Sequence, residues 1–257
     1  MGKTTTAETV VHDEHTSKKL HIGTSGWSYR HWQGSFYPRG VIPRDWLAFY
    51  AENFSTVEIN NSFYRLPERE TFANWSAATP DDFTFAVKAS RYITQFRKLS
   101  GTEDAVRKVL DNARGLGTKQ GPILFQLPAN WHLDLERLGD FAASLPPGYR
   151  YAFEFRHDSW LCDDVYRLLI DKGLAFCISD APAWQTSLEA TAPFVYIRLH
   201  GGRVLYGSEY SQGELDKWAR LIERFAEQQL EVFVYFNNDA QGFAVKNALR
   251  LKKMLSA

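Results

Sequence analysis

The stretch YRYAFEFRH at residues 149–157 carries two kinds of side chain on alternate positions. Phe153 and Phe155 are apolar, whereas Glu154 and Arg156 are charged. Because successive side chains of a β-strand point to opposite faces, this stretch predicts a strand with one apolar and one charged face. Such a strand suits a parallel barrel, in which one face packs on helices and the other points inward.

Seven further runs rich in β-branched and aromatic residues occur along the chain. They are LHIGTS at 20–25, FSTVEINN at 54–61, FTFAVKAS at 83–90, GPILFQLP at 121–128, GLAFCISD at 173–180, FVYIRLHG at 194–201 and EVFVYFNND at 231–239. Most intervening segments have helical spacing, as Val106, Val109 and Leu110 illustrate. The alternation predicts an α/β fold, a single (β/α)8 TIM-type barrel. The connection at 181–193 is too short and too weakly periodic to predict a helix.

An open doubly wound sheet is the alternative fold. No G-x-G-x-x-G turn follows the first run, and GTSGWS at 23–28 does not supply one. The length of 257 residues matches the roughly 250 that one such barrel needs. We expect residues 19–257 to form this single domain and residues 1–18, polar and rich in threonine, to form a disordered tail.

The overall charge argues against two classes of partner. Thirty basic and thirty acidic residues leave no net charge, so the bulk electrostatics favour neither a membrane surface nor a long polyanion. No apolar run reaches the roughly 18 residues of a membrane helix, and the N-terminus has no apolar secretory stretch. These features predict a cytoplasmic protein with no membrane partner.

The inward phase of the strands predicts a polar pocket at one end of the barrel. Its members are Glu58, Asn60, Lys88, Gln126, Glu154, Arg156, Ile178, Asp180, Arg198, His200, Tyr235 and Asn237. The polar members lie near the C-terminal ends of their strands, where enzymes of this fold place their chemistry. The alternative is a structural network in which the three acids neutralise the three basic residues.

Three inward residues are candidates for catalysis. His200 suits a general base, because Arg198 lies two positions away in the same run and would lower its pKa. Glu58 and Glu154 suit a carboxylate pair for glycoside hydrolysis, although neighbouring cations would keep both ionised. The same acids, with Asp180 and His200, are also metal-ligand types, so a metal-dependent phosphoester hydrolase stays open. The sequence does not decide which cofactor or metal, if any, is bound.

Two loops add aromatic side chains near this end of the strands. Trp27 and Tyr29, in the first connecting loop, suit stacking on a sugar or base ring, whereas we expect Trp32 and Phe36 to pack on the barrel rim. The loop at 91–98 interleaves basic and aromatic residues, which keeps a nucleic-acid partner open.

The run RLHGG at 198–202 predicts an anion site. Barrels often hold phosphate with the loops after strands seven and eight, and glycines let the backbone approach an oxyanion closely. We expect an anion between Arg156, Arg198 and His200.

Six motifs, GTSGWSYRHWQGSFYP, EINNSFYRLP, FQLP, EFRHDSW, RLHGG and YFNNDAQGFAVKNA, together resemble the YecE-like family, whose common domain has no assigned function. The resemblance runs from His21 to the last helix. It implies a β/α barrel but supplies no reaction. The site candidates that it implies are Trp27, Tyr29, Trp32, Glu58, Asn60, Phe63, Tyr64, Lys88, Gln126, Glu154, Arg156, His157, Trp160, Arg198, His200, Asn237 and Asn238.

Together these patterns predict an acid/base enzyme for a small polar, anionic, carbohydrate- or nucleotide-like substrate. The alternative is a nucleic-acid or ligand-binding protein without turnover. Salt dependence would separate the two, because binding to a phosphate backbone weakens steeply with salt.

Overall fold

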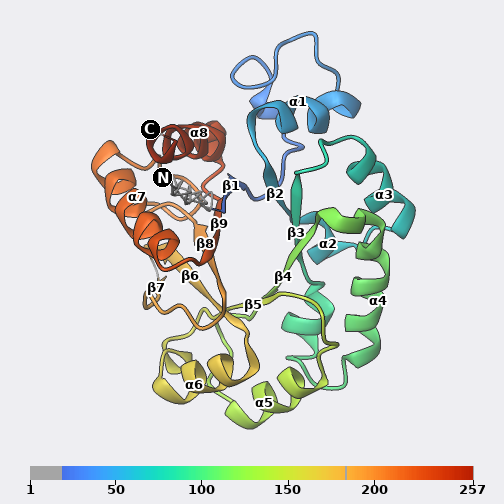
Figure 1. Cartoon of the computed structure of the whole chain (residues 1–257), viewed down its shortest axis with the longest axis vertical. Helices are drawn as coiled ribbons and strands as arrows, with labels where there is room; N and C mark the ends of the chain where they lie inside the picture. Colours follow the sequence, from blue (N-terminus) through green and yellow to red (C-terminus); the bar gives the residue numbers. More distant parts are fainter. Residues whose placement is uncertain (1–18, 183, 257) are drawn as a thin grey trace, which may run out of the picture.

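Each of the eight predicted runs overlaps one strand of a parallel barrel (Figure 1). The computed structural model describes residues 19–182 and 184–256, so the predicted tail lies outside the described residues. The strands are β1 (Leu20–Thr24), β2 (Thr56–Ile59), β3 (Thr84–Lys88), β4 (Gln120–Gln126), β5 (Tyr151–Glu154), β6 (Ala175–Ala181), β8 (Phe194–Leu199) and β9 (Glu231–Phe236). A short β7 (Trp184–Gln185) pairs antiparallel with β6. The predicted TIM-type (β/α)8 barrel is confirmed.

The eight parallel strands nearly close on themselves. Their order is β1-β9-β8-β6-β5-β4-β3-β2, which leaves β1 and β2 at the two ends. A single bridge between Ser25 and Glu58 joins these ends, and the backbone N–H of Gly26 donates to the carbonyl of Glu58 at 2.8 Å. The seam between β1 and β2 is therefore the most sparsely bonded part of the ring.

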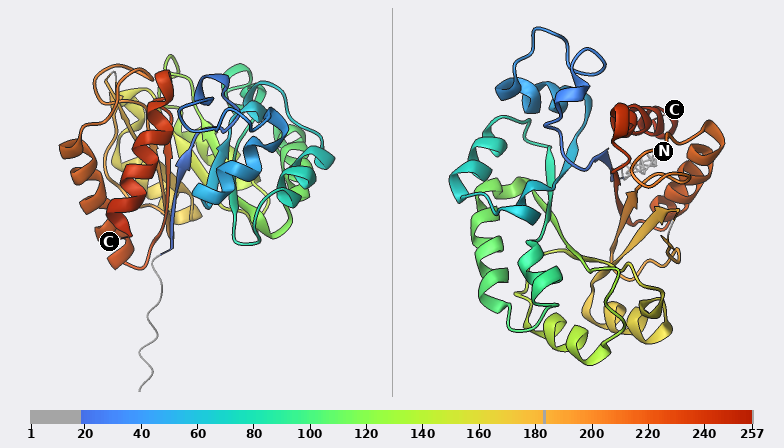
Figure 2. Two further views of the ribbon diagram at one scale, coloured as in Figure 1. Left: turned by 90° about the horizontal axis from the view of Figure 1, so that it is seen from above. Right: turned by 180° about the vertical axis from the view of Figure 1, so that it is seen from behind.

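Helices surround the strands in every view (Figure 2). The longer ones are α1 (Trp46–Asn53), α3 (Arg69–Ala77), α4 (Glu103–Ala113), α5 (Leu135–Ser144), α6 (Asp163–Lys172), α7 (Gln212–Glu227) and α8 (Phe243–Leu255), and a short α2 (Asn61–Tyr64) follows β2. Ser211 begins α7 with a capping box, because its side chain accepts from the N–H of Glu214, whose carboxylate in turn accepts from the N–H of Ser211. None of the helices within the described ranges is long and apolar enough to cross a membrane.

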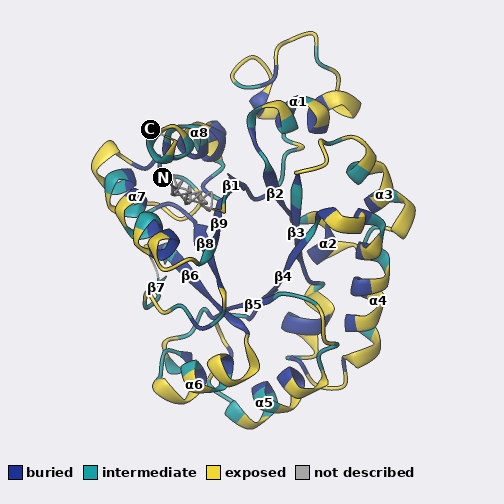
Figure 3. Ribbon diagram, in the orientation of Figure 1, coloured by how far each residue is buried: buried dark blue, intermediate teal, exposed yellow. Residues whose placement is uncertain are grey.

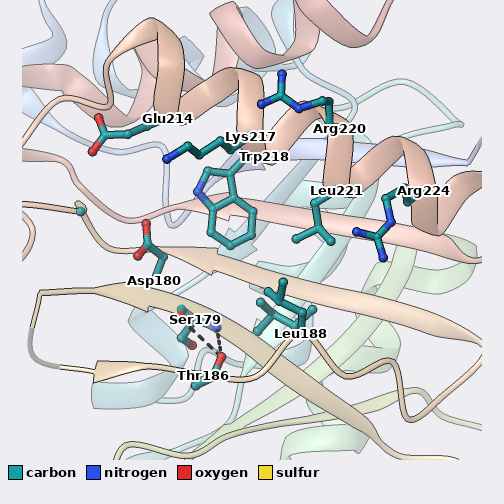
Figure 4. Close-up of a pocket in the computed structure, with 12 residues that line it drawn as sticks. Ser179, Asp180, Thr186, Leu188, Glu214, Lys217, Trp218, Arg220, Leu221 and Arg224 are labelled. Atoms are coloured by element: carbon teal, nitrogen blue, oxygen red, sulfur yellow. Dashed lines mark hydrogen bonds between the residues drawn. The ribbon is translucent and has the colours of Figure 1, made fainter.

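The connection between β6 and β8 has no helix in its described residues, 182 and 184–193. A hollow of about 630 Å³ lies beside this connection, between β6 and α7, and Figure 4 shows Trp218 and Leu221 of α7 pointing toward Leu188. Other barrel connections fill this layer with a helix. The hollow is thus the consequence of the short connection, and it lies outside the barrel, between β6 and α7.

The buried apolar residues form two clusters, one between the strands and the helices and one inside the barrel. The strands are buried on both faces, whereas the helices expose their outer surfaces (Figure 3). The outer cluster includes Phe153 and Phe155, as predicted. The inner cluster contains smaller side chains and aromatic rings, namely Ala86, Leu124, Ala152, Ala175, Cys177, Phe194, Tyr196, Phe233 and Tyr235. The predicted register of β5 is therefore confirmed.

The predicted phase of β6 is wrong. Ile178 belongs to the outer cluster, while Cys177 lies inside with its Sγ 3.7 Å from Oγ of Ser179. Asp180 shares the outward phase of Ile178. The error has a physical cause: both faces of β6 carry apolar residues, so apolar character alone does not identify the outer face.

Candidate functional site

Arg198, on β8, lies at the centre of the predicted polar group. Its Nε and Nη2 donate to Oε2 and Oε1 of Glu58 at 2.9 and 2.8 Å, and its Nη1 donates to Oε2 of Glu154 at 2.5 Å. Ser25 and Tyr196 donate their hydroxyls to the same Glu58 carboxylate at 2.6 and 2.7 Å. All three charged side chains are 0% exposed. Arg198 therefore pairs with both buried carboxylates, and the three charges sum to −1.

The two glutamates are held in the ionised form. Burial opposes ionisation of Glu58, but the Arg198 guanidinium outweighs it and lowers the pKa of this carboxyl. Burial also opposes ionisation of Glu154, yet Arg198, Arg156 and His200 together bring its pKa well below the usual value. Neither acid keeps a proton near neutral pH, which a carboxylate pair for glycoside hydrolysis would need.

His200 is fully buried and bonded on both ring nitrogens. Nε2 lies 3.1 Å from Oε1 of Glu154, and Nδ1 lies 3.1 Å from Nδ2 of Asn237. An amide nitrogen donates, so Nδ1 is the acceptor and Nε2 carries the proton that it donates to Glu154. Burial, aided by Arg198 and Arg156, lowers the pKa of His200 to about 4 although Glu154 opposes the shift. The ring is therefore neutral near pH 7, and the predicted effect of Arg198 has the right direction.

Two further cations lie beside this network. Arg156 donates from Nε to Oε1 of Glu154 at 3.0 Å, and its guanidinium lies 4.6 Å from the ring centre of Trp184. Lys88, at the end of β3, is 8% exposed, and its Nζ lies 4.2 Å from the ring centre of Phe63. Within the described residues, Nζ of Lys88 makes no hydrogen bond or ion pair. Burial, and then Arg198, lower the pKa of Lys88 to about 7.

Other predicted residues line the same end of the barrel. Asn60 follows β2, and its Oδ1 is buried without a hydrogen-bond partner among the described residues. Gln126 ends β4 and is 6% exposed. Tyr29 donates its hydroxyl to the carbonyl of Ser25 at 2.6 Å, which fixes the first loop beside the seam. Tyr64 is 69% exposed on the rim.

The remaining aromatic residues of the first loop pack on their surroundings. Trp27 makes an edge contact with Trp75 of α3 at 5.1 Å between ring centres. Trp32 is 0% exposed and donates from Nε1 to Oδ1 of Asp239 at 2.8 Å. Phe36 packs edge-on against Trp32 at 5.6 Å. The expected packing of Trp32 and Phe36 on the rim is confirmed.

Two polar candidates lie against the loop that follows β8 and not inside the barrel. Asp180 accepts from the hydroxyl of Tyr210 at 2.9 Å and lines the hollow beside α7, so it does not join the inward acids. Asn238 is fully buried and donates to the carbonyl of Ser208 and to Oδ1 of Asn247, both at 2.9 Å. Both side chains organise the loop that follows β8.

Three other candidates have structural contacts. Trp160 is fully buried and donates from Nε1 to the carbonyl of Trp131 at 2.7 Å. His157 accepts from the N–H of Ser159 through Nδ1, and thus organises the turn before Trp160. Tyr235 lies deep inside the barrel with its hydroxyl 2.8 Å from Oγ1 of Thr56.

The predicted anion position has few donors to offer. Every nitrogen of Arg198 already donates to Glu58, Glu154 or Ser25, and both nitrogens of His200 are bonded. The N–H of Gly201 donates to the hydroxyl of Tyr210 at 3.0 Å. The hydrogen-bond donors without a partner among the described residues are instead Nζ of Lys88 and the terminal nitrogens of Arg156.

The four suggested metal ligands do not converge, because Asp180 lies outside the barrel. Across residues 19–182 and 184–256, no group of three or more His, Cys, Asp or Glu side chains has the geometry to hold a metal ion.

Sequence reasoning missed three features of the site. Tyr196 lies two positions before Arg198, so strand alternation could have placed it beside Glu58. Trp184 lies in the irregular connection after β6, where no periodic signal exists. A π-helix at Tyr92–Phe96 lies in the connection after β3, and π-helical turns occur often at functional sites.

Comparison with known proteins identifies relatives over almost the whole chain. The family model described as "Protein of unknown function DUF72" matches residues 21–257. The chain is 25% identical to the UPF0759 protein YunF of Bacillus subtilis, over 92% of this chain and 94% of that protein. It is 30% identical to the UPF0759 protein YecE of Escherichia coli K12, over 60% of this chain and 55% of that protein.

A solved structure agrees with these sequence matches. The crystal structure of a DUF72 family protein from Thermotoga maritima superimposes with a TM-score of 0.85 and 28% identity, covering 93% of this chain and 99% of that one. The match of the family model to nearly the entire barrel and the shared fold lead to one conclusion: the chain belongs to the DUF72 family of proteins of unknown function.

Proposed function

We propose that the C-terminal mouth of the barrel binds a small, polar, anionic substrate and performs acid/base chemistry on it, with Lys88 as the titrating group. One observation carries this proposal. Lys88 is buried beside an ion-paired network, yet its Nζ has no hydrogen bond or ion pair within the described residues. A buried, unpaired cation is costly unless a ligand or a proton loss compensates it.

The charges of the network support an anionic ligand. Glu58 and Glu154 balance Arg198 and Arg156, so a protonated Lys88 is the surplus positive charge of the mouth. The terminal nitrogens of Arg156 add donors in the fixed fork that suits carboxylate and phosphate. An anion bound between these two side chains would pair the surplus charge.

Two features support acid/base turnover on a hydroxylated molecule. A pKa of about 7 lets Lys88 take up and release a proton near neutral pH, as an efficient general base requires. The unpartnered Oδ1 of Asn60 supplies an acceptor for a substrate hydroxyl. In this proposal Glu154 and His200 position Arg156 and Arg198 and keep their charge in place, and they transfer no proton themselves.

A rim feature favours nucleic acid as the second candidate ligand. The guanidinium of Arg91 lies 5.5 Å from the ring centre of Tyr64 and 5.4 Å from that of Phe96. Both rings are largely exposed, at 69% and 67%. Exposed rings beside an arginine suit stacking with bases.

Calorimetric titration with phosphate and glucose 6-phosphate tests the binding step. We expect Lys88→Met and Arg156→Met each to weaken the binding of at least one anion by about tenfold or more, and Lys217→Met, an exposed change on α7, to leave it unaltered. Absence of binding by the wild type at about 1 mM, or equal binding by all variants, contradicts the anion site.

Incubation with a cellular metabolite extract, followed by mass spectrometry, tests turnover. We expect at least one compound to be consumed by the wild type and not by Lys88→Met. An unchanged extract, together with intact anion binding, would assign the chain to binding without turnover. A mobility shift on single-stranded nucleic acid that weakens steeply with salt, and is lost in Arg91→Ser, would instead favour the second candidate.

A further inference from the structure

We propose that Lys88 is a nucleophile that forms an imine with the substrate, so that the mouth takes a small aldehyde or ketone carrying an anionic group. This inference rests on the proposed function and narrows it to one substrate class. It assigns the free amine a covalent role in addition to proton transfer.

The position of Lys88 suits a reacting group. It ends β3, and its carbonyl accepts from Oγ of Ser62 at 2.6 Å, while its backbone pairs in register with Leu124 of β4. The backbone of Lys88 is therefore fixed in the barrel. Its Nζ lies 4.2 Å from the ring centre of Phe63. The small remaining exposure of 8% leaves a narrow approach for a ligand.

The surroundings keep the amine free for reaction. Glu58 and Glu154 are the nearby acids, but both already accept from Arg198, so neither holds Lys88 in a close ion pair. Burial and the positive charge of Arg198 favour the neutral amine and lower the pKa of Lys88 to about 7. Desolvation beside another cation is a known way to activate a lysine for imine formation.

The step balances without a further reactant. The Nζ lone pair attacks the carbonyl carbon, a C–N bond forms, and the carbonyl oxygen takes a proton to give a carbinolamine. That oxygen then leaves as water, carrying in total the two hydrogens of the amine, and a C=N bond remains. No oxidation or reduction occurs. A protonated imine also withdraws electrons from the adjacent carbon, which connects this step to the proposed acid/base chemistry.

The arrangement also explains the preference for an anionic carbonyl compound. Once Lys88 has reacted, its nitrogen is bonded to the substrate carbon, and Arg156 is the cation with free donors that remains to hold an anionic group of the ligand at the mouth. Its terminal nitrogens have no partner among the described residues, and its guanidinium is kept over Trp184 at 4.6 Å. A carboxylate or phosphate on the substrate would lie there, while its carbonyl reaches Lys88.

Reductive trapping tests the proposal on the full chain. Wild-type protein is incubated with pyruvate or dihydroxyacetone phosphate and sodium borohydride, and the modified residue is located by peptide mass spectrometry. We expect a stable adduct on Lys88 with at least one of the two probes, no adduct in Lys88→Met, and an unchanged adduct in Lys108→Met, an exposed change on α4. Trapping spread evenly over exposed lysines, or absent from Lys88 with both probes, overturns the imine.

A second measurement needs no variant and so does not depend on folding of the mutant. The labelling rate of each lysine of the wild type by acetic anhydride is followed against pH. Half-maximal labelling is expected near pH 7 at Lys88, compared with about 10.4 for an ordinary lysine. A midpoint near the ordinary value at Lys88 contradicts the proposal.

These outcomes separate the imine from the function on which it rests. If anion binding and turnover depend on Lys88 but borohydride traps nothing there, the lysine is a proton-transfer group and the imine is wrong. If neither anion binding nor trapping occurs, the proposed function fails with it.

Discussion

Arg198 illustrates how one residue determines the chemistry available to its neighbours. It occupies two carboxylates that would otherwise be the obvious acids and bases of the mouth. Its planar fork reaches both at once, which a lysine at this position could not do with the same geometry. Arg198 satisfies Glu58 and Glu154, and Lys88 beside them keeps an amine without a hydrogen bond or ion pair among the described residues, whose pKa burial lowers to about 7.

We predict that Glu58→Gln destabilises the protein by about 3 kcal/mol, because it removes one partner of a fully buried ion pair and leaves Arg198 undercompensated. The free energy of unfolding in urea measures this loss. The control is Asp164→Asn, which removes an exposed pair with Arg167 at 2.8 Å and should cost less than about 1 kcal/mol. A loss at Glu58 no larger than that of the control would show that the buried network contributes little to stability.

At the scale of elements, the sequence predicts the strands well and the connections unevenly. Strong alternation at residues 153–156 places Glu154 and Arg156 correctly, since charged side chains alternate there with Phe153 and Phe155. The inward face of β6 holds Cys177, so both faces are apolar and the phase of Ile178 cannot be chosen. The connection at 181–193 has no helical periodicity, and the structure has the hollow between β6 and α7 at this place.

The same limit applies to the site. Sequence phase identifies which polar side chains enter the barrel, but not which of their donors stay free. That depends on contacts between distant strands, such as Arg198 with Glu58, 140 residues apart. The sequence therefore predicts an anion between Arg156, Arg198 and His200, while in the structure the donors without a partner among the described residues lie on Lys88 and Arg156.

The hollow beside α7 leads to a prediction about two leucines of that helix. Leu215 is 0% exposed, so Leu215→Ala should cost about 2–5 kcal/mol through the cavity it leaves. Leu221 lines the hollow and is only partly buried, so Leu221→Ala should cost less than half as much. Urea unfolding of both variants provides the comparison. Equal losses would indicate that another chain covers the hollow in solution.

At the scale of the molecule, the strands of the barrel are unevenly hydrogen-bonded to their neighbours. β8 pairs in register with β6 along one edge and with β9 along the other. β2 pairs in register with β3 but meets β1 through one bridge. Local unfolding begins at the elements with the fewest hydrogen bonds. We therefore expect the ring to open first at the seam between β1 and β2.

We therefore predict faster hydrogen–deuterium exchange at residues 56–59 than at residues 194–199. Both strands are buried, so solvent exposure in the closed ring does not account for a difference. Peptide-resolved mass spectrometry under native conditions measures it. Equal protection of the two strands would mean that the seam is as firmly closed as the rest of the ring.

The separation of 140 positions between Glu58 and Arg198 also sets a delay during synthesis. At about 5 to 20 residues per second, a ribosome releases the arginine roughly 7 to 28 seconds after the glutamate. Throughout that interval the nascent chain carries a carboxylate whose interior partner does not yet exist, and burying it alone would be costly. The first strands therefore stay exposed to water during this interval. The ring can close only after most of the chain has been synthesised.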